Sequence, residues 1–512
     1  MTIRPEPFQT HPLYDVTATK VLEQAALAHG VAHVLMERAG AATARLAAAL
    51  APNARHIWIA CGQGNNGGDG LEAAVQLRRS GRPVSVSFGG DPERLPSDAR
   101  WALDRAHDEG VVFSDGPPAN LAPHDLCIDA LLGIGIRGAS RAVPPWMASA
   151  LEALQRAPCP VLAVDVPSGL DASTGQYAEG FVAAPASQAD RHTLSLLTLK
   201  PGLFTGRGRD AAGTIWFDSL GIDASWFVQA TPTAWLSARP TTPPRAHASH
   251  KGSFGDVAVL GGESLGRRGM GMGGAALLAA SAALHAGAGR ALVALLDDGS
   301  NLGIDLSQPE LMLRWPAALD LAQGAVVCGC GGGQAVAEHL DRVLAESRRL
   351  VLDADALNSI AADAALQDLL RSRADRDVCT ILTPHPLEAA RLLQTDAKAV
   401  QADRLAAARQ LADRFGCVVL VKGSGTVLAA PGLTPLVNPT GNGRLATAGT
   451  GDVLAGMIGA RLAGTRAGQV LNMLEVLHVA RDAVYHHGAL ADGWPDHLPL
   501  SAGALARQSP DR

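Results

Sequence analysis

Short apolar runs alternate with segments of helical periodicity along most of the chain. In the first fifty residues, Ala, Leu, Val and Met recur at helical spacing from Val21 until Pro52, which predicts two helices. Helical segments at about 70–80 and 98–109 then separate strand-like runs at residues 56–61, 83–88, 125–132 and 160–166. This rhythm predicts βαβ units built around a mainly parallel sheet.

A stretch rich in Pro and Thr interrupts this alternation, and we interpret residues 223–247 as a linker between two domains, 1–222 and 248–512. After it, a helix is predicted over about 274–287 and a final helix opens within 447–456. The strand-like runs cover residues 256–262, 291–296, 324–330, 350–357, 379–385 and 417–423. The second part is therefore a further α/β domain and not a repeat of the first.

Charge and composition narrow the class of protein. The 512 residues include 43 Lys and Arg against 49 Asp and Glu, a net charge of −6 that argues against a nucleic-acid partner. The longest apolar stretch, Gly273 to Leu296, contains His285 and Arg290, so we expect a buried helix and strand and no membrane span. Seven scattered cysteines predict no disulfide framework, and the start of the chain has no export signal, which favours the cytoplasm.

A Gly-rich turn, GQGNNGGDG at 62–70, directly follows the first strand. Gly62, Gly64 and Gly67 match G-x-G-x-x-G, which aims backbone N–H groups and a helix N-terminus at a phosphate. The side chains of Asn65, Asn66 and Asp69 are suited to coordinating a hard cation and equally suited to capping the helix. The local sequence leaves both interpretations open.

Two carboxylates end strands in the same half. Asp129 precedes ALLGIGIRG, and Asp165 begins DVPSG. Ligands of open α/β sheets gather at the carboxyl ends of strands, so these side chains suit a ribose, a cation or a reacting proton, although such residues also form turns.

The second half has its own candidate base in TAGTGDVLAG at 447–456. Asp452 begins a helix whose dipole and turn stabilise an anion, where a carboxylate can deprotonate a hydroxyl that attacks a phosphate; it can equally be an N-cap. A phosphate-loop kinase is excluded, because the nearest match, from Gly261, has Arg267 and Arg268 in place of Lys and a hydroxyl.

Residues from about 10 to 222 resemble the NAD(P)H-hydrate epimerase domain, through LMERAG, NNGGDG, DALLG, DVPSG and LKPGLFTG. The resemblance implies a Rossmann-like fold that interconverts the R and S epimers of hydrated NADH or NADPH and uses K⁺. It implies substrate contacts from Asn65, Asn66, Gly67, Gly68, Asp69, Gly133, Ile134, Gly135, Ile136, Arg137, Gly138, Ala139 and Asp165, K⁺ ligands at Asn66, Asp129 and Ser168, and catalytic help from Asp165 and Lys200. Ile134 departs from the family, which usually has Thr there.

Nearly the whole second domain resembles the ADP- or ATP-dependent NAD(P)H-hydrate dehydratases, ribokinase-like proteins, through HKGSFGDV, GGAALLAASAAL, VLDADALN, TPHPLEAARLL and VKGSGTVL. The resemblance implies that Asp452 is the general base, that Ala275, Gly331, His385 and Asp452 hold the hydrate, and that Lys422, Gly423, Ser424, Gly425, Thr426 and Gly451 bind the nucleotide. Asp353 and Asp355 are Mg²⁺ candidates or turn caps, and His385 suits a purely local role as well. Cys330 stands where the family prefers Pro, and the loop before the helix at 274 is expanded.

Together these resemblances imply two doubly wound, three-layer α/β domains in one repair enzyme. The first epimerises NADHX and NADPHX, and the second dehydrates the S epimer at the expense of ADP, which gives AMP and phosphate; ADP is preferred to ATP because such fusions resemble bacterial enzymes. Relatives of the second domain commonly assemble, which predicts a homo-oligomer.

Three other functions stay open on sequence alone. A ribokinase-like kinase for a vitamin precursor would form a stable phosphate ester and release no free phosphate. The first domain can instead be a non-catalytic scaffold. A dehydrogenase is the third, because Asp91 follows the next strand after GQGNNG.

Overall fold

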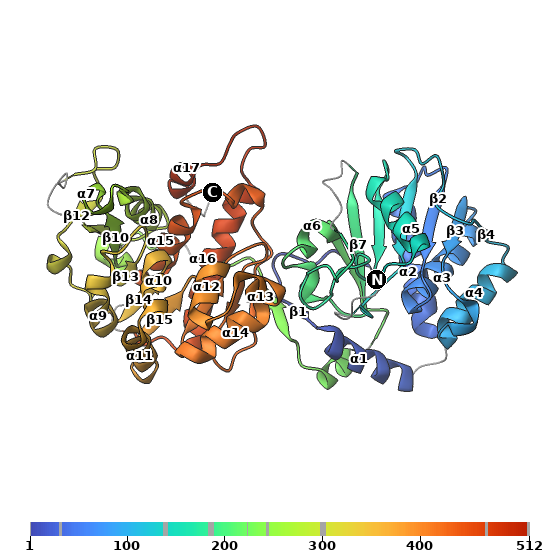
Figure 1. Ribbon diagram of the computed structural model, residues 1–512, viewed down its shortest axis with the longest axis horizontal. Helices are drawn as coiled ribbons and strands as arrows, with labels where there is room; N and C mark the ends of the chain where they lie inside the picture. The colour runs from blue at the N-terminus through green and yellow to red at the C-terminus, as the bar shows by residue number, and fades with distance from the viewer. Residues whose placement is uncertain are drawn as a thin grey trace. The chain divides into compact units, whose positions relative to one another are not determined.

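The alternation of strands and helices is present in the computed structural model, which describes residues 2–29, 33–136, 142–182, 189–222, 224–241, 245–296, 304–465 and 469–508. The chain divides into two compact units, Met1–Leu236 and Ser237–Arg512 (Figure 1). The stretch interpreted as a linker contains a short helix, η3, and strand β9, and the domain boundaries themselves stay a prediction.

The elements of the first unit are β1 His11–Leu13, α1 Val16–His29, α2 Val34–Leu50, β2 Ile57–Cys61, α3 Asn65–Arg79, β3 Val84–Phe88, η1 Pro92–Arg94, α4 Ser97–Asp108, β4 Val112–Phe113, β5 Leu126–Ala130, α5 Pro145–Arg156, β6 Val161–Val164, β7 Arg191–Leu196, η2 Pro201–Leu203, α6 Gly208–Ala212, β8 Thr214–Asp218, η3 Ala224–Gln229 and β9 Ala234–Leu236. The sheet is parallel in the order β4-β3-β2-β5-β6-β7-β8. The order reverses between β2 and β5, and ligands of such sheets bind at that point.

Side chains of β2 alternate between two cores, as the pleat of a strand requires. Ile57 and Ile59 pack with helices α2, α3 and α4, whereas Trp58 packs with α5 on the other face. Helices therefore cover both faces of the sheet, which confirms a three-layer, Rossmann-like unit.

The elements of the second unit are η4 Lys251–Phe254, β10 Asp256–Glu263, α7 Leu265–Arg268, α8 Gly273–His285, β11 Arg290–Leu296, β12 Met312–Leu313, η5 Pro316–Ala318, β13 Ala325–Cys328, α9 Ala337–Glu346, β14 Arg349–Leu352, α10 Ala354–Ala362, α11 Ala364–Ser372, η6 Arg373–Asp375, β15 Cys379–Leu382, α12 Pro386–Leu393, α13 Ala397–Ala402, α14 Arg404–Phe415, β16 Val418–Val421, β17 Val427–Ala429, β18 Leu436–Val437, η7 Gly443–Leu445, α15 Thr450–Ala463, α16 Met473–Asp492 and α17 Ala502–Ala506.

Strands of this unit follow the order β18-β17-β16-β15-β14-β13-β10-β11-β12, parallel from β16 to β12 and antiparallel at β17 and β18. Helices α8 and α15 lie side by side and pack on β10, while α14 packs on β16 (Figure 1). The sequence pattern predicted that the helix near residue 450 is the last one. This prediction was wrong, because α16 and α17 follow it. None of the described helices is both long enough and apolar enough to cross a lipid bilayer.

Candidate active sites

The NNGGD segment forms the first turns of α3, five residues earlier than the helix predicted from about residue 70. This start depends on glycine, since a Cβ at Gly67 would lie 1.8 Å from the carbonyl oxygen of Gly62. Gly67 and Gly68 face packed neighbours, whereas Asn65, Asn66 and Asp69 line a cavity of about 840 Å³. Of the predicted lining, Gly133 to Ile136 also face this cavity, and Arg137, Gly138 and Ala139 lie outside the described residues.

Asp129 and Ser168 are hydrogen-bonded to each other, and the loop at 131–133 connects them with Asn66. Ser168 Oγ donates to Asp129 Oδ1 at 2.5 Å, and Ser168 N donates to Oδ2 at 2.9 Å. Leu132 N donates to Ser168 Oγ at 2.9 Å, which places the loop that continues to Gly133 over the pair. A Cβ at Gly133 would lie 3.2 Å from Asn66 Oδ1.

The amide of Asn66 has unsatisfied hydrogen-bonding groups. The residue is only 8% exposed, and neither Oδ1 nor Nδ2 has a hydrogen-bond partner among the described residues. Burial raises the pKa of Asp129, against the hydrogen bonds from Ser168 and Leu131. A buried amide oxygen without a partner, joined through one loop to a carboxylate and a hydroxyl, offers oxygen ligands of the kind that a hard cation takes.

A buried ion pair joins Asp165 to Lys200. Lys200 is 0% exposed, its Nζ donates to the Leu196 carbonyl oxygen at 2.6 Å, and it also contacts Asp165 Oδ1. Leu196 N donates to the same carboxylate oxygen at 3.1 Å. Asp165 adopts a left-handed backbone with φ 65°, strain of the kind that gathers at functional sites. Both side chains line the cavity, so the structure brings the two predicted catalytic residues together.

Two further carboxylates line this cavity that the sequence analysis missed, Glu23 on α1 and Asp98 on α4. Burial, followed by the charge of Asp165, raises the pKa of Glu23. Burial, with the charges of Asp165 and Glu23, raises the pKa of Asp69 well above its usual range. Glu23 belongs to a helix with no motif, so no local signal marked it.

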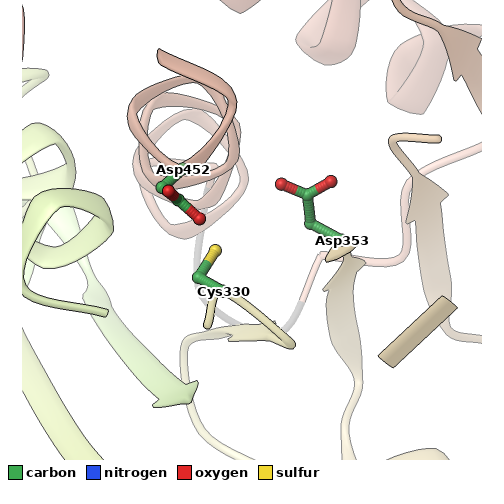
Figure 2. A group of neighbouring side chains, drawn as sticks. All are labelled: Cys330, Asp353 and Asp452. Atoms are coloured by element: carbon green, nitrogen blue, oxygen red, sulfur yellow. The ribbon is translucent and has the colours of Figure 1, made fainter. Parts of the chain in front are cut away.

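In the second unit, Asp452 lies in the first turn of α15, beside the ends of several strands. Lys422, which follows β16, donates from Nζ to Asp353 Oδ1, after β14, at 2.7 Å. A Cβ at Gly451 would lie 3.3 Å from Lys422 Nζ and 3.9 Å from Asp353 Oδ2, so the helix start contacts this pair. Cys330, after β13, completes the group with its thiol (Figure 2).

Burial sets the electrostatics here. Burial and the charge of Asp353 raise the pKa of Asp452 to about 7. The hydrogen bond with the Cys330 thiol and the charge of Lys422 act in the opposite direction. Burial also raises the pKa of the Cys330 thiol well above its usual range, and Asp452 adds to that. Although burial lowers the pKa of Lys422, Asp353 and Glu388 outweigh it and raise that pKa. Asp452 therefore has the protonation equilibrium of a general base that works near neutral pH.

The predicted hydrate-binding residues occupy different surroundings. Gly331 lies against α8, where its Cβ would approach that of Ala275 to 2.8 Å. His385 is the N-cap of α12: its Nδ1 accepts from Leu387 N at 3.1 Å, and its Nε2 lies 3.1 Å from Glu388 Oε1. The local role that the sequence left open for His385 is thus present, although its ring stays 45% exposed.

The predicted nucleotide segment, residues 422–426, is the turn between the antiparallel strands β16 and β17. Arg404, at the start of α14 and only 3% exposed, donates to the carbonyl oxygens of Ser424 and Gly425. Nε2 of His487, on α16, lies 2.9 Å from the carbonyl oxygen of Thr450. Burial lowers the pKa of His487 to about 4, so a neutral imidazole is bonded to the start of α15. Both supporting residues were missed, because neither belongs to a motif.

The side chains of Asp353 and Asp355 do not both cap turns, which was one of the two roles predicted for them. Asp353 is the N-cap of α10 but makes no capping bond through its side chain, which pairs with Lys422 instead. Asp355 Oδ2 accepts from Gly333 N at 2.8 Å. The charges of Asp353 and Asp355 both act on the Asp452 carboxylate, and Lys422 opposes them. That excess of negative charge and the oxygen donors fit a divalent cation.

Comparison with known proteins identifies two families along the chain. Residues 32–202 match the family described as YjeF-related protein N-terminus, and residues 258–506 match the family described as NAD(P)H-hydrate dehydratase. The bifunctional NAD(P)H-hydrate repair enzyme of Escherichia coli is 36% identical over 478 residues, which cover 90% of this chain and 84% of the relative.

Two further relatives each cover about half of this chain. The ADP-dependent (S)-NAD(P)H-hydrate dehydratase of Neisseria meningitidis is 41% identical over 268 residues, 51% of this chain and 84% of that protein. The structure of the ADP/ATP-dependent NAD(P)H-hydrate dehydratase from Bacillus subtilis, crystallised with ATP and Mg²⁺, is 30% identical, covers 52% of this chain and 91% of that one, and superposes with a TM-score of 0.41.

Proposed function

This chain belongs to the family of bifunctional NAD(P)H-hydrate repair enzymes, and from that premise we propose the roles of its residues. The first unit is the epimerase and the second is the ADP-dependent dehydratase. The observation that supports the dehydratase assignment best is Asp452, a carboxylate with its pKa raised to about 7, in the first turn of α15 beside Lys422 and Asp353.

In the dehydratase, the Asp452 carboxylate takes the proton from the hydroxyl of the S hydrate. The hydroxyl oxygen then bonds to the terminal phosphorus of ADP, and the bond to the bridging oxygen breaks to leave AMP. Loss of the phosphate with a proton from the neighbouring ring carbon restores the 5,6 double bond of NADH or NADPH. Lys422, which lies beside the N-terminus of α15, would present positive charge to the phosphates together with that helix end.

The turn at 422–426 would bind the nucleotide, and Arg404 fixes its backbone. Gly331, Ala275 and His385 would hold the hydrate. Asp353 and Asp355 would hold Mg²⁺ through water, where the ion would balance the charge of the phosphates. Lys422 keeps Asp353 in place for that role.

In the epimerase, the cavity would enclose the hydrated ring between Asp165 and the Asn65–Asp69 turn. Lys200 holds a proton at a fixed point, bonded to the Leu196 carbonyl and to Asp165. The ring hydroxyl departs as water after it gains a proton, and water returns to the opposite face and releases one. Asn66, Asp129 and Ser168 would ligate K⁺, which would neutralise the buried carboxylate beside the substrate phosphates.

The chain is proposed to act on both NADHX and NADPHX in the cytoplasm, as a homo-oligomer. The test mixes R and S NADHX with ADP, Mg²⁺ and K⁺, and follows the near-ultraviolet absorbance of NADH together with free phosphate. Wild type should convert both epimers with one phosphate released per NADH. Asp452→Asn should form none, and Asp165→Asn should stop once the S epimer is consumed.

Three outcomes would contradict the proposal. Phosphorylation of a hydroxymethyl substrate without release of phosphate would identify a kinase. Conversion of both epimers by Asp165→Asn would show either that the first unit is a scaffold or that its catalytic group is a different residue. Reduction of NAD⁺ by an alcohol would identify a dehydrogenase.

A further inference from the structure

Three metal-ligating side chains meet beside the start of α15. The Sγ atom of Cys330 and one carboxylate oxygen each of Asp353 and Asp452 all lie within 4.8 Å of one another. They come from three places in the chain, after β13, after β14 and on α15, and Figure 2 shows the thiol directed toward the Asp452 carboxylate. Cys330 is 0% exposed and Asp353 1%.

The charge around this cluster is unbalanced. The charges of Asp353 and Asp355 both act on Asp452, and they are opposed by Lys422, which is bonded to Asp353 Oδ1. Asp353 Oδ2 is directed elsewhere, toward Gly451. Each of the three cluster residues therefore has a donor atom that the lysine does not occupy.

We propose that Cys330, Asp353 and Asp452 form a binding site for a thiophilic divalent cation, with Zn²⁺ as the fitting ion. One thiolate and two carboxylate oxygens are ligands that Zn²⁺ accepts, with a water molecule in the fourth position. At Zn–S of about 2.3 Å and Zn–O of about 2.0–2.2 Å, ligand atoms lie closer together than 4.8 Å. The site forms when the side chains rotate slightly toward the ion.

The thiol decides which ion is preferred. Mg²⁺ takes oxygen ligands in octahedral geometry, whereas thiolate selects Zn²⁺ and related ions. The ion replaces the proton of the Cys330 thiol, because only the thiolate ligates. The nucleotide's Mg²⁺, held through water on Asp353 and Asp355, shares Asp353 with this site but gains nothing from the thiolate, so the thiophilic ion is favoured there.

Occupation blocks the dehydratase, because the ion engages the carboxylate that takes the proton from the hydrate. This consequence rests on the role proposed for Asp452, whereas binding of the ion does not. The epimerase cavity lies in the other unit, so the ion should not inhibit epimerisation.

Binding is tested first, with Co²⁺ as the probe for Zn²⁺ and full-length, chelator-treated protein. Wild type should bind with a thiolate-to-Co²⁺ absorption band that Zn²⁺ abolishes. Cys330→Ala should lack the band, whereas Cys328→Ala should keep it, since Cys328 is equally buried two residues away but outside the cluster. A band that survives in Cys330→Ala, or no band in wild type, overturns the proposal.

Inhibition is tested next, by titration of Zn²⁺ against the dehydratase at fixed Mg²⁺ and ADP. Each variant is referred to its own zinc-free rate, and Cys330→Ser is a second variant of near-equal size. Both Cys330 variants should need at least about tenfold more Zn²⁺ for half-inhibition, and Cys328→Ala should match wild type. Equal midpoints in all four proteins overturn the proposal. No zinc-free dehydration in wild type contradicts the proposed function instead, and the Co²⁺ band still decides whether the site exists.

Discussion

Each unit contains a lysine–aspartate pair, buried in the first unit and partly buried in the second, and the two pairs have different roles. Lys200 pairs with Asp165, a proposed catalytic residue, within the cavity lining. Lys422 pairs with Asp353, while the proposed base, Asp452, has no salt bridge of its own among the described residues. Loss of either partner's charge leaves the other charge buried and uncompensated, so Asp165 is changed to Asn, which keeps the size of the side chain.

The pH dependence of the dehydratase follows from Asp452. Its pKa is raised to about 7, so the carboxylate loses its proton as the pH rises through that value. The base form acts, and kcat/KM for the S hydrate should fall below about pH 7 and approach a tenfold loss per pH unit. Rates measured from about pH 5 to pH 9 at saturating ADP check this. A flat profile would show that Asp452 is not the base.

The dependence of the epimerase on K⁺ should follow from Asn66. Asn66→Ala removes the buried amide oxygen that lacks a partner, so the K⁺ concentration for half-maximal epimerisation should rise at least about tenfold. The matched control is Asn65→Ala, on the same turn and exposed, which should leave that concentration unchanged. The measurement is the rate of R-to-S conversion during K⁺ titration in choline chloride. An equal midpoint in wild type and Asn66→Ala would remove Asn66 from the ion's ligands.

At the level of elements, each site depends on a helix whose first turn points at the ends of strands. Helix α3 carries Asn66 and Asp69, and α15 carries Asp452. Close packing fixes the second of these helices, because Gly456 on α15 leaves no room for a side chain next to α8. A Cβ there would lie 2.0 Å from the carbonyl oxygen of Ala279.

Gly456→Ala should therefore destabilise the second unit by about 1–3 kcal/mol and lower dehydratase activity, since the helix that carries Asp452 must shift. The control is Gly274→Ala on α8, whose Cβ would meet no heavy atom within 4 Å. That variant should be unchanged or up to about 1 kcal/mol more stable. Urea unfolding followed by circular dichroism measures both. Equal stability of Gly456→Ala and wild type would mean that the two helices separate easily.

At the level of the whole molecule, each unit holds its own site, so the two activities should be separable. A mixture of Asp165→Asn and Asp452→Asn proteins should convert both epimers of NADHX to NADH, because the S epimer made by one protein reaches the other through solution. The measurement is total NADH formed, with each variant alone as the control. If the mixture converts no more of the hydrate than Asp165→Asn alone does, the epimer does not pass between molecules.

The sequence by itself determined the architecture of both units. The strands at 56–61 and 417–423 were predicted to within one or two residues, because alternating buried strands and helices leave a local hydrophobic pattern. Asp129 and Asp165 at the ends of strands, and Asp452 at the start of a helix, were also identified, since each belongs to a short motif with glycine. Even there, the start of α3 was placed too late, because its first turns are rich in glycine, a poor helix former.

Only the tertiary structure decided what surrounds these residues. Glu23 and Asp98 join the epimerase cavity, and Arg404 and His487 support the dehydratase site, from helices with no motif. Cys330 meets Asp452 across more than a hundred residues of chain. Burial and charge–charge interactions depend on distance in space, so a local pattern does not contain them. The raised pKa of Asp452 and the cation site at Cys330 are therefore properties of the fold.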